Sequence, residues 1–234
     1  MHQVTNPIQA CNDIFLKPNG VFHAVGEKHN WSWLPFFIVT VMAVLPGYLY
    51  FSTVDITWYQ DLIMSSQYAD ASPAERDAMR QSMTRTAMST FAIIGTVLGV
   101  LILNAVFAGY LNVATRSDEE CVQGFTDWYG FTWWVSMPMI FNSIVAIALL
   151  FLADTAEIAP TALSPLSLAY LLNIPMDSDW FGLTQTLRLD VAWSAYLMTV
   201  GVRQWTHFNA QKATTIALAP CAVILGIWLV LVIV

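Results

Sequence analysis

The chain has 234 residues, of which 57% are hydrophobic and only 11% are charged, and its formal net charge is −7. A soluble domain typically has about 25% charged residues, so this composition indicates an integral membrane protein. The nine Lys and Arg residues are scattered along an acidic chain, which argues against a nucleic-acid partner. Cys11, Cys121 and Cys221 show no metal-binding spacing, and we expect three free thiols.

The N-terminal segment places Ile8, Cys11, Ile14 and Phe15 at spacings of three and four residues. This pattern indicates one apolar face on a short helix within residues 6–17. The helix is too short to cross a bilayer, and we expect it to lie along the cytoplasmic surface or under the bundle. Residues 1–31 are therefore expected to form a cytoplasmic amphipathic segment, and residues 32–234 a membrane domain.

Five later stretches are long and apolar enough to cross a bilayer, which takes about 20 residues. They are expected to form transmembrane helices over residues 32–53, 87–115, 130–153, 184–203 and 213–234. The predicted fold class is an all-α polytopic membrane helix bundle of five transmembrane helices. Pro46 and Gly47 predict a kink in the first of them.

Two segments between these spans have helix signals of their own. Ser72-Pro73-Ala74-Glu75 has the pattern of a capping box with proline at the first helical position. Because neither Gly nor Pro occurs between Ala74 and Phe91, we expect this helix to run unbroken into the second span. The apolar run between Pro165 and Pro175 is too short to cross, so a re-entrant or interfacial helix on the outer side is expected.

The orientation follows from the positions of the basic residues, because Lys and Arg near helix ends favour the cytoplasmic side. A cytoplasmic N-terminus places five basic residues inside and the arginines of residues 76–85 outside. The five inner residues are Lys17, Lys28, Arg116, Arg203 and Lys212. The prediction is an N-terminus inside and a C-terminus outside.

A segment near the expected fourth and fifth spans resembles a known family. WSAYLMTVGVRQWTHFNAQKA (193–213) is similar to the bacterial Yip1-domain pattern, in which a Trp-bearing helix leads through a Gly to a polar turn. Lys-Ala then opens the last helix of that pattern. The matching residues are Trp193, Leu197, Gly201, Lys212 and Ala213. The start of the chain, NPIQACNDIFLKPNGVF (6–22) with Trp33 and Pro35 after it, also resembles the opening of this family.

A third stretch, DWYGFTWW (127–134), is similar to the DLYGPxW motif of eukaryotic Yip1-type proteins. It departs from that motif at Trp128 and Phe131, where the motif has Leu and Pro. The resemblance, over residues 6–234, implies a five-span protein of the bacterial inner membrane. Eukaryotic members are trafficking factors of the ER and Golgi that bind small GTPases and each other. The resemblance therefore implies a non-enzymatic scaffold or partner-binding protein, as an oligomer or a subunit of a larger complex.

Arg188 and Asp190 lie near the start of the expected fourth span. An ionisable residue in a span is a functional hypothesis by default, because its burial costs about 2.5–3.5 kcal/mol on insertion scales. Arg188 can extend to the interface, whereas Asp190 is too short to do so as easily. Residues that are two positions apart on a helix point to opposite sides. Arg188 and Asp190 are therefore not expected to form a good ion pair with each other. Arg188 and Asp190 either act as anchors or structural polar contacts, or they line a cavity or ligand site.

Asn104 and Asn142 lie within the second and third expected spans. One interpretation is interhelical hydrogen bonding. The alternative is that Asn142 and Asp190 form a polar pathway in a small channel, transporter or lipid-handling protein. Gly95 and Gly99 form a GxxxG motif, which predicts close helix packing within the bundle or between subunits.

No motif in the sequence proposes a reaction: HExxH, GxSxG, GxxxxGK[ST] and GxGxxG do not occur. We therefore expect neither enzymatic activity nor a cofactor. His29 and His207 would share the cytoplasmic face, which leaves a metal site there as an alternative. The expected partners are the lipid bilayer and a protein, which includes a second copy of the chain.

Overall fold

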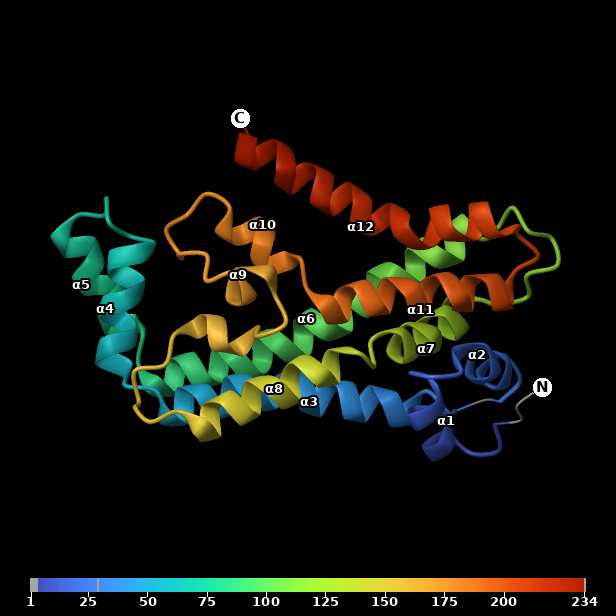
Figure 1. Cartoon of the computed structure of the whole chain (residues 1–234), viewed down its shortest axis with the longest axis horizontal. Helices are drawn as coiled ribbons and strands as arrows, with labels where there is room; N and C mark the ends of the chain where they lie inside the picture. Colours follow the sequence, from blue (N-terminus) through green and yellow to red (C-terminus); the bar gives the residue numbers. More distant parts are fainter. Residues whose placement is uncertain (1–3, 29, 234) are drawn as a thin grey trace. The chain divides into compact units, whose positions relative to one another are not determined.

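The computed structural model describes residues 4–28 and 30–233, and these residues form α-helices, one short 3-10 helix and the loops between them (Figure 1). Contacts divide the chain into two compact units. The first unit contains the residues up to Val41, Gly99–Ile140 and the residues from Asp190 onward. The second unit contains Met42–Leu98 and Phe141–Leu189. Each unit therefore combines segments that are far apart in the sequence.

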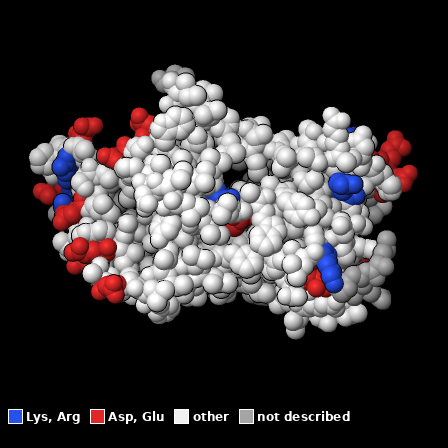
Figure 2. Space-filling view, in the orientation of Figure 1, with Lys and Arg blue, Asp and Glu red and all other residues white. Residues whose placement is uncertain are grey.

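Four parts of the described chain are long and apolar enough to cross a membrane, which confirms an all-α membrane protein. They are α3 (Trp33–Thr53), α6 (Arg85–Ala114), the consecutive helices α7 (Phe125–Val135) and α8 (Met139–Leu152), and α12 (Ala210–Ile233). These match the first, second, third and fifth expected spans. Figure 2 shows that most of the surface on the face in view is uncharged, with charged side chains in a few groups.

The expected fourth span is not confirmed as a crossing. The helix there, α11 (Leu189–Trp205), has 17 residues, so it is about 25 Å long against about 30 Å of hydrocarbon. The preceding α10 (Phe181–Thr186) is a separate helix. The reason for the break is a backbone pairing within the second unit. Leu168 N–H donates to Leu187 O at 2.9 Å, and Leu189 N–H donates to Leu166 O at 3.0 Å.

The third span is interrupted between α7 and α8. Pro138 lies in the gap and has no N–H to donate to the preceding turn. The hydroxyl of Ser136 lies 2.9 Å from Thr132 O and 3.2 Å from Asn104 Oδ1, and it donates toward both. The break is therefore tied to a polar contact with α6, inside the first unit.

The capping box at Ser72 is confirmed. It opens α5 (Pro73–Ser82): Ser72 Oγ accepts from Glu75 N–H at 3.4 Å, and Glu75 Oε2 accepts from Ser72 N–H at 2.8 Å. The expected continuous helix into the second span is wrong, because Met83 leaves the helical conformation at φ −84° and ψ 50°. Thr84 Oγ1 then accepts from Ala87 N–H at 3.2 Å and caps α6.

The N-terminal segment forms α1 (Pro7–Asp13) and α2 (Pro18–Glu27). Ile14 is fully buried beside α1, and Phe15 packs on Trp193 of α11 with ring centroids 5.6 Å apart. Ile8, however, is 75% exposed, so it does not belong to the buried face as expected. An amphipathic helix on the cytoplasmic surface is not confirmed, and that location stays a prediction.

The re-entrant or interfacial helix expected at 160–175 is not confirmed. It contains the 3-10 helix η1 (Pro160–Leu163) and α9 (Leu168–Leu171), each of four residues. Tyr50 of α3 donates its hydroxyl to Ile158 O at 2.8 Å, just before this segment. Tyr50, Val54 and Leu150 form the buried core of the second unit.

The core of the first unit is aromatic and joins α2, α7 and α11. Phe131 of α7 lies 4.9 Å from Phe22 of α2 and 5.0 Å from Trp205 of α11, measured between ring centroids. Trp128 packs on the same Trp205 at 5.1 Å. Aromatic pairs of this kind stabilise a core beyond their buried area, by about 0.5–1.5 kcal/mol each. This cluster fixes α7 against its neighbours and so positions the site described next.

Candidate functional site

A pocket of about 620 Å³ lies in the first unit, where α3 and α7 begin. This volume falls in the range of about 300–1,000 Å³ that is typical of small-molecule sites. Its aromatic lining residues are Trp33, Phe36, Tyr129, Trp133 and Trp205, and its polar lining residues are Lys28, Asn30, Ser32, Gln123, Thr126 and Asp127. We call it the aromatic pocket.

The aromatic wall of the pocket is a continuous series of edge-to-face rings. Ring centroids are 5.4 Å apart for Trp33 and Phe36, 4.8 Å for Phe36 and Trp133, and 5.8 Å for Tyr129 and Trp133. The corresponding interplanar angles are 82°, 78° and 86°. Because neighbouring rings are nearly perpendicular, the wall can present ring faces as well as ring edges.

The wall between α3 and α7 is held by a close approach of the two helices. Trp134 Nε1–H donates to Ser32 Oγ at 3.1 Å. A β-carbon built at Gly130 would lie 2.8 Å from the same oxygen, so a larger residue does not fit there without a shift. On the other side, Trp205 Nε1–H donates to Phe22 O at 2.8 Å. Contacts within the chain therefore hold the walls of the pocket in place.

Asp127 and Lys28 give the pocket one group of each charge. Asp127 Oδ2 accepts from Gly124 N–H at 2.9 Å, which satisfies a free donor at the start of α7. Lys28 follows the last residue of α2. Both side chains belong to exposed residues. The pocket therefore offers a carboxylate, an ammonium group and aromatic rings to one ligand.

The residues that keep the DLYGPxW motif all line this pocket. Asp127, Tyr129, Gly130 and Trp133 are lining residues. The two departures from the motif, Trp128 and Phe131, are fully buried in the core. Sequence reasoning missed the pocket, although Thr126, Tyr129, Gly130 and Trp133 have the spacing of one helical face. What the sequence could not supply was the second wall, from the start of α3.

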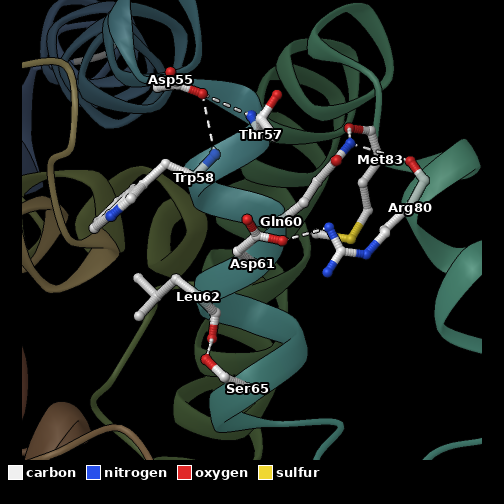
Figure 3. A network of polar contacts seen from close by, with 9 residues as sticks. All are labelled: Asp55, Thr57, Trp58, Gln60, Asp61, Leu62, Ser65, Arg80 and Met83. Carbon is white, nitrogen blue, oxygen red and sulfur yellow. Dashed lines mark hydrogen bonds and ion pairs between the residues drawn. The ribbon is translucent and has the colours of Figure 1, made fainter. Parts of the chain in front are cut away.

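A second polar arrangement lies in the second unit, in the hairpin of α4 (Ile56–Ser66) and α5 (Figure 3). Gln60 Nε2 donates to Arg80 O at 3.1 Å and to Met83 O at 2.9 Å, and Asp61 forms an ion pair with Arg80. Asp55 caps α4 by accepting from two backbone N–H groups. We call this segment, residues 55–83, the α4–α5 hairpin.

Both asparagines that the sequence indicated are buried and hydrogen-bonded. Asn104 Nδ2 donates to Val100 O at 2.9 Å in its own helix, and its Oδ1 accepts from Ser136. Asn142 Nδ2 donates to Leu163 O at 3.1 Å, and its Oδ1 accepts from Leu166 N–H at 3.3 Å. Asn104 therefore joins α6 to the α7–α8 break, and Asn142 holds the backbone around η1.

Asp190 is 2% exposed and lies in the first turn of α11. The partial positive charge of a helix N-terminus favours a carboxylate at this position. Arg188 precedes the helix, and its backbone forms an isolated antiparallel bridge with Ser167. Asp190 and Asn104 belong to the first unit, whereas Arg188 and Asn142 belong to the second. A polar pathway that uses Asp190 and Asn142 stays a prediction.

Comparison with known families decides the class of the protein. The model of the Yip1 domain matches residues 12–231. The chain belongs to the Yip1 domain family. No curated protein and no solved structure matched it. The resemblance seen in the sequence is thereby confirmed over nearly the whole chain.

Among the described residues, no other helix approaches the two glycines of the GxxxG motif. A β-carbon built at Gly95 or Gly99 would have no atom of the described residues within 4 Å, apart from its own helix. The nearby side chains of Phe91, Ile94 and Ile102 are exposed. The expected close packing inside the bundle is therefore not seen at these glycines, and packing between subunits stays a prediction.

His207 of the Yip1 domain contacts two acidic residues of the loop after α6. Its backbone N–H donates to Asp118 Oδ2 at 2.7 Å, and its Nε2 lies 3.1 Å from Glu120 Oε2. The hydrogen bond from His207 N–H is the main cause that lowers the pKa of Asp118. Among residues 4–28 and 30–233, His, Cys, Asp and Glu form no group of three suited to a metal ion. His29 lies outside the described residues.

Proposed function

We propose that this Yip1-family membrane protein is a non-enzymatic scaffold or partner-binding protein, which acts as an oligomer or as a subunit of a larger complex in membrane organisation or trafficking. The observation that carries the proposal is what the polar side chains do in the structure. Asn104 and Asn142 make hydrogen bonds that hold the fold. The charged side chains are concentrated outside the apolar helices, above all in the α4–α5 hairpin.

The α4–α5 hairpin has the properties of a recognition surface. Its two helices are braced by Gln60 and by the ion pair of Asp61 with Arg80. Arg85, at the start of α6, donates to Phe51 O at 2.5 Å and to Val54 O at 2.8 Å, which ties the end of α3 to the start of α6, on either side of the hairpin. A surface that is fixed before binding loses less conformational entropy when a partner docks. A hairpin that is held in one conformation therefore favours the binding of a protein partner over catalysis.

The partner can be tested by crosslinking in native membranes. A photo-crosslinking residue at Asp77, which is exposed on α5, should capture a defined partner, and the same residue at exposed Glu157 serves as the control. Purification in mild detergent followed by mass spectrometry identifies what is captured. A lone monomer in every condition, with no crosslink from Asp77, would contradict the proposal.

The second candidate is a small channel, transporter or lipid-handling protein, and the buried carboxylate of Asp190 is the observation that favours it. Flux and lipid-scrambling measurements in liposomes test it. If Asp190 takes part, Asp190→Asn should change the rate, while the exposed control Asp179→Asn should not. An unchanged rate for Asp190→Asn would remove this residue from the mechanism.

We also propose a bacterial inner-membrane location with the N-terminus inside and the C-terminus outside. This orientation requires an odd number of crossings, so it requires α11 to cross in addition to the four longer apolar segments. A reporter that is active on only one side of the membrane, fused after Ile233, measures it. Activity on the outer side supports five crossings, and activity on the cytoplasmic side contradicts the orientation.

A further inference from the structure

The aromatic pocket lies at the start of two segments that are long and apolar enough to cross a membrane. Two of the membrane-crossing segments, Trp33–Thr53 and Phe125–Leu152, begin beside it. The polar lining residues Lys28 and Asn30 precede the first of these segments, while Phe36 lies inside it. The pocket wall therefore changes from polar to aromatic in the direction in which a phospholipid changes from headgroup to acyl chain.

The charges of the pocket match a zwitterion. The rings of Trp33 and Tyr129 can contact an ammonium group by cation–π attraction, and the carboxylate of Asp127 supplies the opposite charge. Asp127 is kept in place by its hydrogen bond from Gly124 N–H at 2.9 Å. Lys28 supplies a positive charge for a phosphate. An anionic lipid without an amine would satisfy Lys28 but would bring no cation to Asp127.

We propose that the aromatic pocket binds a membrane phospholipid whose headgroup carries an ammonium group beside the phosphate, such as phosphatidylethanolamine. The ammonium group lies against Trp33, Tyr129 and Asp127, and the phosphate is bound by Lys28. The pocket is preformed, because Gly130 and Ser32 hold α7 and α3 together at its base. The site does not depend on a protein partner, so it can exist whether or not the chain is a scaffold.

Native mass spectrometry of the full chain in detergent can test the site with phosphatidylethanolamine and phosphatidylglycerol that have identical acyl chains. We expect the wild type to prefer phosphatidylethanolamine by about tenfold, a ratio within the energy of a partly desolvated cation–π contact. Asp127→Asn and Trp33→Leu should each remove most of this preference. Lys28→Gln should lower the affinity for both lipids by a similar factor, because both lipids carry the phosphate.

Matched controls separate the pocket from general effects of charge and surface. Glu119→Gln, Lys17→Gln and Trp180→Leu change exposed residues that do not line the pocket, and they should leave both affinities unchanged. Thermal unfolding of every variant checks that it is folded. Asp127, Lys28 and Trp33 are exposed, so these substitutions should leave the fold intact.

Three results would overturn the inference. The first is an equal affinity of the wild type for the two lipids, and the second is a preference that survives in both Asp127→Asn and Trp33→Leu. The third is full displacement of the lipid by equimolar soluble glycerophosphoethanolamine. This third result would mean that the site takes the free zwitterion rather than a membrane lipid. Retention of the lipid against this competitor supports the assignment.

Discussion

The ring of Phe131 on α7 lies directly against the backbone of Gly201 on α11 and leaves no room for a β-carbon there. The same ring contacts Phe22 and Trp205, so three helices meet at this point. Gly201 is one of the residues that carry the family resemblance. Its lack of a side chain is what allows α11 to approach α7 so closely.

Gly201→Ala should therefore destabilise the protein. Overpacking of a core costs about 1–3 kcal/mol, because the ring or a helix must move. Unfolding in detergent micelles, followed by the loss of helical circular dichroism, measures the change. Gly226→Ala is the matched control, since a β-carbon there meets no atom of the described residues outside its own helix within 4 Å. Equal losses in the two variants would contradict the packing described for Gly201.

Gln60→Ala should loosen α5 from α4. The substitution leaves the carbonyls of Arg80 and Met83 without the amide that binds them, and a partly buried group left unsatisfied costs about 1–3 kcal/mol. Hydrogen exchange of residues 73–84 should become faster. Gln81→Ala, at an exposed position on α5, should have little effect. Unchanged exchange in Gln60→Ala would mean that the hairpin is held by other contacts.

The contact between Asp118 and His207 should depend on pH. The pKa of Asp118 is lowered chiefly by the hydrogen bond from His207 N–H, so folding favours the ionised carboxylate. Its stabilisation is fully present above the unfolded pKa, about 3.9, and is lost as the pH falls through the lower folded value. Exchange of the His207 amide should rise in this acidic range. Asp118→Asn should remove this pH dependence, whereas Glu119→Gln should preserve it.

Asn142→Leu should release the backbone around η1. The variant removes the donor to Leu163 O and the acceptor for Leu166 N–H, and the orphaned groups cost about 1–3 kcal/mol. Faster exchange of the Leu166 amide and a lower stability in micelles are the expected results. Asn12→Ala, at an exposed position on α1, is the control. Normal exchange at Leu166 would show that Asn142 does not hold this loop.

The helix signals of the sequence were reliable where they depend on neighbours in the chain. The capping box at Ser72 formed as expected, because its partners are three residues apart. The same reasoning failed at Met83, where the helix ends without Gly or Pro. There the amide of Gln60, from another helix, binds two carbonyls at the end of α5, and Thr84 opens a new helix.

In the candidate site, too, the sequence indicated some features and missed others. The sequence indicated Asn104, Asn142 and Asp190 from their position in apolar segments, and the structure places all three in buried sites. It did not indicate the aromatic pocket, whose aromatic residues have the composition expected of any membrane boundary. The pocket exists because α3 and α7 meet at Ser32 and Gly130.

The sequence by itself determined the family, the membrane class and four of the apolar helices, because length and hydropathy are properties of a continuous segment. The tertiary structure decided the start of α11 and the aromatic pocket. Leu187, just after α10, and Leu189, the first residue of α11, pair through their backbones with residues 166–168, about twenty positions earlier in the chain. Such contacts join segments whose distance is fixed only after the chain has folded.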